Sequence, residues 1–256
     1  MDKMKKLAIV LALGLAWAHS LRAGLVTGFG DIQIWAGDGA SATNRAALVV
    51  QWNINSVAYS YAWGFGWNSG APTGRDMLQA VDAADTHLTV DYHPGQNAVF
   101  GMFYDLNQNA SSYTPGVPGF VDYGTPANTI HDTHGIAESG DLYQSGWADG
   151  FWAYSISGGN FTYYDYFASA NVNYSSPGST TYAGVTWDSS PVGDMSRELV
   201  NGSWDTFNFS DDVIGYTTAA AVQPLAAAAV PEPSTALLAL LATGVLLYAR
   251  RRLLAC

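Results

Sequence analysis

The sequence predicts an α+β domain, mostly β, with antiparallel sheets and one packed amphipathic helix. It also predicts an N-terminal signal peptide and a C-terminal transmembrane segment. Apolar and aromatic runs of strand length are separated by breaks rich in Gly, Asn and Pro. One stretch spaces its apolar residues as a helix does, and uncharged apolar runs lie near both chain ends.

Residues 1–20 have the composition of a signal peptide. A basic start with three lysines precedes the apolar run 7–18, and Ala18-His19-Ser20 offers small residues before a cut. Twelve apolar residues are too few for an ordinary membrane-spanning helix. An uncleaved N-terminal anchor is the alternative, and the body of the chain is exported in either case.

The first two strands are expected at 46–52 and 56–63, joined as a hairpin through Asn53-Ile54-Asn55. In the second run large side chains alternate with small ones, which predicts one heavily packed face. Further strands are expected at 87–92, 97–105, 150–157, 161–174, 180–187 and 204–209.

The predicted helix begins after Thr73, which caps its N-terminus together with Asp76 three residues later. Apolar residues then recur with helical spacing, with Asp82 and Asp85 off the stripe. The stripe consists of Met77, Val81, Ala84 and Leu88. Such a helix packs against an antiparallel sheet.

Charge and cysteine content limit the function of the body, the single domain predicted at 24–216. It holds 19 of the 21 acidic residues, three arginines and no lysine, a formal charge of about −16. A surface this acidic repels nucleic acid, which is excluded as a partner. The one cysteine is the last residue, Cys256, so the body has no disulfide, cysteine nucleophile or cysteine-ligated zinc.

The strongest metal candidate is His131-Asp132-Thr133-His134, two imidazoles three residues apart that could bind zinc with His93 or Asp91. The chain has no His-Glu-x-x-His pattern, and a polar loop with incidental histidines is the favoured interpretation. The pairs Asp211-Asp212 and Asp82/Asp85 could bind calcium, but no EF-hand spacing occurs. We therefore expect no metal and no cofactor.

Signatures of hydrolases are weak. The sequence has neither Gly-x-Ser-x-Gly nor, in the body, the lysine that Ser-x-x-Lys requires. With Glu138 and Glu198 as the body's glutamates, an acid/base pair would have to include aspartate. We expect a protein that is not an enzyme; the alternative is a secreted aspartate-dependent hydrolase acting on polysaccharide.

Two aromatic clusters could stack on sugar rings if they were exposed, although an aromatic core is the favoured interpretation. They are Tyr61, Trp63, Phe65 and Trp67 in one case, and Trp147, Phe151, Trp152 and Tyr154 in the other.

The C-terminal region changes composition twice. Residues 217–229 are small, uncharged and Ala-rich, and predict a linker. A proline-rich pentapeptide, the fifteen uncharged residues 235–249 and an arginine cluster follow. As a helix, 235–249 would reach roughly 22 Å, less than the roughly 30 Å of a hydrocarbon core, so it is a marginal transmembrane segment. The arginines favour the cytoplasmic side.

In order and spacing this tail resembles the PEP-CTERM sorting signal of Gram-negative bacteria, which is sometimes catalogued as an ice-binding C-terminal region. The resemblance implies Sec-dependent export, transient inner-membrane anchoring, processing by an exosortase, and delivery to the outer surface or extracellular matrix. It places the sorting signal at residues 230–256. The residues of the motif are Val230, Pro231, Glu232, Pro233, Ser234, Arg250, Arg251 and Arg252.

The order of motifs in the body resembles an uncharacterised family of exported bacterial proteins, which implies one domain and no particular chemistry. These motifs are Val49-Val-Gln-Trp52, Tyr61-Ala-Trp-Gly-Phe-Gly-Trp67, Gly74-Arg-Asp-Met-Leu78, Phe151-Trp-Ala-Tyr154 and Asn201-Gly-Ser-Trp-Asp205. We therefore predict a non-enzymatic cell-surface or matrix protein, structural or glycan-associated, with an exosortase, the Sec machinery and exopolysaccharide as its expected partners.

Overall fold

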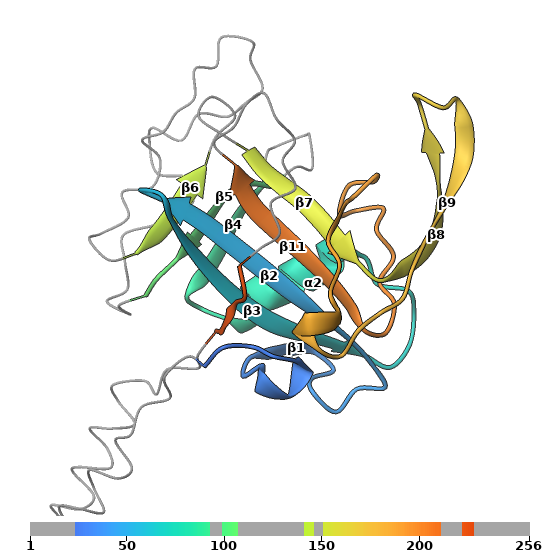
Figure 1. Ribbon diagram of the computed structural model, residues 1–256. Coiled ribbons are helices and arrows are strands. Elements are labelled where there is room, and N and C mark those ends of the chain that lie inside the picture. The colour runs from blue at the N-terminus through green and yellow to red at the C-terminus, as the bar shows by residue number, and fades with distance from the viewer. Residues whose placement is uncertain (1–23, 93–98, 107–140, 146–150, 211–221, 228–256) are drawn as a thin grey trace, which may run out of the picture. The chain divides into compact units, whose positions relative to one another are not determined.

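The computed structural model describes residues 24–92, 99–106, 141–145, 151–210 and 222–227. These residues form one sheet of seven strands, one of three and one of two, together with one α-helix (Figure 1). The elements are η1 (Phe29–Asp31), β1 (Trp35–Gly37), β2 (Asn44–Ile54), β3 (Val57–Trp67), α2 (Gly74–Ala84), β4 (Leu88–Tyr92), β5 (Val99–Tyr104), β6 (Leu142–Ser145), β7 (Phe151–Ser157), β8 (Gly159–Asp165), β9 (Ala170–Ser176), η2 (Tyr182–Gly184), β10 (Asp188–Ser189), β11 (Ser203–Ser210) and β12 (Leu225–Ala226).

The predicted first hairpin is present and longer than expected. β2 and β3 pair antiparallel from Asn44↔Trp67 to Ile54↔Val57. Asn55 and Ser56 form the two-residue connection, both with positive φ (51° and 64°), as in turns that match the twist of paired strands.

The seven-stranded sheet is mixed, which corrects the expectation of antiparallel sheets alone. Its order is β1-β3-β2-β11-β7-β10, and β12 also pairs with β3. β11 lies between β2 and β7, parallel to β2 and antiparallel to β7. β1 and β12 both run parallel to β3. The central strands β2 and β11 are buried on both faces, as strands in parallel pairs usually are.

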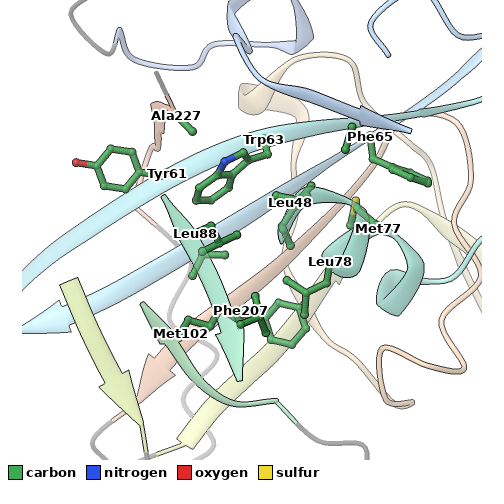
Figure 2. Packing of buried hydrophobic residues seen from close by; sticks show 14 of the residues in the cluster. Leu48, Tyr61, Trp63, Phe65, Met77, Leu78, Leu88, Met102, Phe207 and Ala227 are labelled. Carbon is green, nitrogen blue, oxygen red and sulfur yellow. The ribbon is translucent and has the colours of Figure 1, made fainter. Parts of the chain in front are cut away.

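On one face of this sheet lie α2 and the antiparallel sheet β4-β5-β6. Figure 2 shows Met77 and Leu78 of α2, Leu88 of β4 and Met102 of β5 in one cluster with side chains of the large sheet. A hydrogen bond from Trp52 Nε1 to the carbonyl of Met102 (2.9 Å) joins the two sheets inside this core.

The opposite face is covered by two irregular segments. Val26, Phe29 and Ile32 come from the first described residues, and Tyr182, Val185 and Trp187 come from the segment around η2. They pack on the small side chains of β2 and β3 and on Trp204 of β11, which is fully buried. The sequence predicts one heavily packed face for β3, whereas both faces of the sheet are packed.

The helix begins as predicted but ends earlier. Thr73 Oγ1 accepts from the Asp76 amide (3.2 Å), and Asp76 Oδ2 accepts from the Thr73 amide (2.7 Å). The last helical residue, Ala84, is exposed, and Leu88 belongs to β4, so the predicted stripe is wrong at both positions. Asp85, expected off the stripe, is 2% exposed and caps the C-terminus.

Two expected strands differ from the structure. The expected strand 161–174 is a hairpin, β8 and β9, with a turn between them. The expected strand 180–187 is η2 with irregular flanks, because carbonyl and amide groups of this segment bond to Phe29 and Thr27 outside any ladder. The other expected strands correspond to β4, β5, β7 and β11 in their described residues.

The chain ends divide into described and undescribed parts. Residues 222–227, within the predicted linker, belong to the described fold through β12. The predicted signal peptide, residues 217–221 and 228–229 of the linker, and the segment 235–249 lie outside the described residues. Among the helices that the structure describes, none is long and apolar enough to cross a membrane.

Candidate functional site: an exposed aromatic hairpin

The first predicted aromatic cluster belongs to the core. The exposed fractions of its four side chains on β3 lie between 0% and 9%, with Trp63 fully buried. Trp63 Nε1 donates to Asp85 Oδ2 (2.7 Å), so even its polar edge is used internally. Phe65 and Trp67 border a shallow hollow of about 470 Å³, but neither ring is offered to solvent.

The described members of the second predicted cluster, Phe151, Trp152 and Tyr154, do not form an exposed platform either. Trp152 is 9% exposed, and its ring packs on Trp52 and Phe209. Tyr154 stacks on Phe207 and donates its hydroxyl proton to Asp205. Phe151 is half-buried, and Trp147 lies outside the described residues.

Exposed aromatic side chains gather instead on the β8–β9 hairpin, a separate two-stranded ribbon drawn in yellow in Figure 1. On one face, Phe161 stacks on its cross-strand partner Tyr174 (centroids 5.0 Å apart, 27° between planes). Tyr163 follows on the same face, paired with Val172. These side chains are half-buried, because no described layer covers this face as a second sheet would.

The tip of the hairpin is more exposed. Tyr166 is 85% exposed, and Phe167 is 103% exposed, as open as in an extended peptide. Asp165 Oδ1 accepts from the amides of Phe167 (2.8 Å) and Ala168 (3.1 Å), which fixes the turn that presents both rings. Tyr164, 50% exposed, lies edge-on to Tyr166.

Apart from Tyr164 near the tip, the other face of the hairpin is polar and uncharged. Asn160, Thr162, Asn171, Asn173 and Ser175 are all exposed. Thr162 Oγ1 donates to Asn173 Oδ1 (2.7 Å) across the strands. The hairpin has one charged residue in 159–176, Asp165, in a body of formal charge about −16.

The base of the hairpin is fastened to the large sheet by Arg197, which is fully buried. Its guanidinium donates to the carbonyl of Gly158 and to Asp205 Oδ1 (3.3 Å), and lies 5.6 Å from the Phe161 ring centroid. Tyr174 adds a hydrogen bond to Asp188 Oδ2 (2.9 Å). Burial and this bond raise the pKa of Tyr174 to about 12, so its hydroxyl remains a neutral donor.

Described aspartates that could serve a hydrolase or bind calcium have partners inside the protein. Asp85 accepts from Trp63 and from His87, whose Nδ1 is 2.8 Å from Oδ1. Asp194 forms a two-pronged pair with Arg75 (2.5 and 3.0 Å). Burial raises the pKa of Asp205, opposed by Arg197. Asp82 Oδ1 accepts from the Val90 amide, so Asp82 and Asp85 have different hydrogen-bond partners.

Metal candidates are mostly untested by the structure. In the part of the chain that it describes, no three His, Cys, Asp or Glu side chains come together as metal ligands. The motif His131-Asp132-Thr133-His134, His93, Asp211 and Asp212 lie outside the described residues, and so does the Asp91 side chain.

The sequence did not predict the hairpin, because 161–174 has the composition of one strand. Two signals were available. Asp165 precedes the four turn residues 166–169, and the last of these, Ser169, adopts a positive φ (51°). The aromatic residues here alternate with Asn and Thr, whereas those of β3 alternate with Ala, Gly and Ser.

The comparison with family models concerns the other end of the chain. Residues 229–252 match the model described as PEP-CTERM protein-sorting motif. Comparisons with curated proteins and with solved structures find no match. The match covers the tail alone, so the resemblance of the body motifs remains a prediction. It includes all eight residues that the sequence assigned to the sorting motif, from Val230 to Arg252. The chain therefore carries a PEP-CTERM protein-sorting motif and is an exosortase-sorted protein exported to the cell envelope or surface.

Proposed function

We propose that the exported domain is a non-enzymatic, glycan-associated component of the cell surface or extracellular matrix. It binds neutral polysaccharide through the β8–β9 hairpin. The observation that carries this proposal is the group of exposed rings at the hairpin tip, Tyr164, Tyr166 and Phe167, beside exposed amide and hydroxyl side chains.

The chemistry of the two hairpin faces suits a sugar polymer. A pyranose ring has a flat face of C–H groups that stacks on an aromatic ring, and hydroxyls around its edge that bond to amides. Large exposed rings on a soluble surface usually mark a binding site. Tyr with Asn and Ser is also the composition of recognition loops that combine rigid rings with adaptable hydrogen bonding.

Charge selects the class of polysaccharide. Asp165 is the one charged residue of the hairpin, so the ligand surface has little charge of its own. The rest of the body is strongly acidic. An acidic polysaccharide would be repelled by that field, whereas a neutral one would not.

Retention of the purified full chain on cellulose, dextran and alginate tests the proposal. We expect binding to at least one neutral polymer and none to alginate at low salt. Replacing Tyr166 and Phe167 together by alanine should weaken binding at least about fivefold, since each ring contact is worth about 0.5–1.5 kcal/mol. The matched control is Val57→Ala, which removes an exposed apolar side chain (50%) from the other hairpin. Unchanged binding by the tip variant, or no binding to any neutral polymer, would refute the proposal.

A further inference from the structure

The two ends of the described domain are hydrogen-bonded to each other. Leu25 and Leu225 form an isolated antiparallel bridge. The Val26 amide donates to the Pro224 carbonyl (2.8 Å), and the Ala226 amide donates to the Gly24 carbonyl (2.8 Å). We call this pairing of 24–26 with 222–227 the terminal clasp.

The clasp is part of the packed sheet. Ala226 is 1% exposed and lies in the core on one face, whereas Ala227 is 0% exposed and lies in the core on the other. β12 pairs with β3, and the Ala227 amide donates to the Ala62 carbonyl (3.1 Å). Figure 2 shows Ala227 near Tyr61 at the end of the main core. Alanine fits here because larger side chains would not be accommodated between buried neighbours.

Side-chain hydrogen bonds also hold residues 222–227, in addition to the strand pairing of β12 with β3. Gln51 Oε1 accepts from the Val222 amide (2.7 Å), and Gln223 Nε2 donates to the Val26 carbonyl (3.1 Å). Tyr182 donates to the Val222 carbonyl (3.3 Å). Residues 222–227 thus have partners on β2, β3, the N-terminal segment and η2, and their release is an opening event with a free-energy cost.

The sorting motif begins almost immediately after this anchored segment. Three residues separate Ala227 from Pro231, so at most about 14 Å of extended chain lies between them when the clasp is closed. Release of residues 222–227 from their partners adds these six residues, about 20 Å of extended chain, to the length between the domain and Pro231. A protease binds several residues of its substrate in extended form, which needs space on both sides of the backbone.

We propose that the terminal clasp controls access to the sorting motif. The motif is processed while residues 222–227 are released from β3, and closure of the clasp afterwards completes the domain. The processing rate then scales with the fraction of molecules whose clasp is open. This inference rests on the sorting motif and the clasp contacts, and it is independent of the ligand of the β8–β9 hairpin.

A disulfide across the clasp tests the proposal directly. Leu25 and Leu225 are opposite each other, and the bonds on either side of them mark a non-hydrogen-bonded pair, whose Cα atoms are about 4.5 Å apart, within disulfide range. Leu25→Cys with Leu225→Cys, in a Cys256→Ser background, is followed by pulse-chase in cells that carry the exosortase. We expect at least about tenfold slower conversion of precursor, reversed by a membrane-permeant reductant, because the locked clasp cannot open. The two single-cysteine variants are the controls and should process at the wild-type rate.

A spacer variant keeps the test decisive if the disulfide variant folds poorly. Six Gly/Ser residues inserted after Ala227 leave every clasp contact in place and add about 20 Å of chain. Faster processing than wild type supports control by the clasp. A disulfide-locked protein converted at the wild-type rate, or a spacer without any effect on the rate, would overturn it.

Discussion

The β2–β3 and β8–β9 hairpins are both rich in aromatic residues, yet one forms the core and the other forms the surface. The difference lies in the residues between the rings. On β3 these are Ser60, Ala62 and Gly64, and a Cβ at Gly64 would overlap the ring of Trp35. Small residues therefore admit a second layer on the opposite face.

On β8 the corresponding positions are Asn160, Thr162 and Tyr164, and all three are exposed. Their polar groups keep water as a partner, since burying them without hydrogen bonds would cost free energy. Whether the aromatic face of a strand is buried or exposed thus depends on whether the residues on its other face are small and apolar or polar. Free energies of unfolding, measured with urea on the purified protein and its variants, test this contrast.

Trp63→Ala should have the largest effect. The side chain is fully buried, and its removal leaves a cavity and deprives the buried Asp85 carboxylate of a donor. We expect a loss of about 5 kcal/mol. Trp63→Phe, which keeps most of the volume, should lose clearly less. A loss below about 2 kcal/mol for the alanine variant would show that the site is not a packed core position.

Arg197→Met tests the join between the two regions. It leaves Asp205 buried without its cationic partner and frees the Gly158 carbonyl at the base of β8. We expect a loss of about 3–4 kcal/mol at pH 7.

The matched double variant, Arg197→Met with Asp205→Leu, removes both charges and should recover part of that loss. If the single variant unfolds like wild type, the buried pair does not hold the hairpin. The exposed rings would then need another anchor.

Ala62→Asn places a polar residue, of the kind found between the rings of the β8–β9 hairpin, at a small residue between the rings of β3. Ala62 is fully buried in the second core, and an amide there would lack hydrogen-bond partners. We expect a loss of about 2–3 kcal/mol. The reverse exchange on β9, Asn171→Ala, should be within about 0.5 kcal/mol of wild type, since Asn171 is exposed. Similar losses in both variants would contradict the contrast.

The helix shows what the sequence can predict and what it cannot. Its start depends on Thr73 and Asp76, three residues apart, so the signal is local and was found. Its end depends on Asp85, whose carboxylate binds Trp63, 22 residues earlier in the chain. No local pattern carries that contact, and helical spacing alone extended the helix to Leu88.

The sheet and the candidate site follow the same division. The β2–β3 hairpin was predictable from its neighbours in sequence, whereas β11 beside β2 joins residues about 157 positions apart, such as Gln51 and Asn208. The sorting motif was found because all its information is linear. The two aromatic clusters that the sequence offered were interpreted as core, and their described side chains are buried or half-buried. The exposed rings of the β8–β9 hairpin were not predicted, because exposure is decided by which distant segments cover a strand.

Asp82→Asn should change stability slightly and in a pH-dependent way. Burial raises the pKa of Asp82 above its value of 3.8 in the unfolded chain, although the Val90 amide opposes this. Ionisation is then costlier in the folded state, so this group lowers stability as the pH rises above 3.8. The Asn variant should gain less than about 1 kcal/mol at pH 7, because the carboxylate is only half-buried, and nothing near pH 3. A gain independent of pH between 3 and 7 would point to packing instead of charge.

Phe167→Ala should have the smallest effect on folding and sharpens the contrast most. The ring is fully exposed and contributes nothing to the described core, so its removal should change stability by less than about 0.5 kcal/mol. The loss of unfolding free energy on replacement by alanine would then be about ten times larger at Trp63 than at Phe167, although both changes remove an aromatic ring. If Phe167→Ala destabilises by more than about 1 kcal/mol, the tip is covered in the native protein. The hairpin would then be a structural element, and the rings would not be available to a polysaccharide.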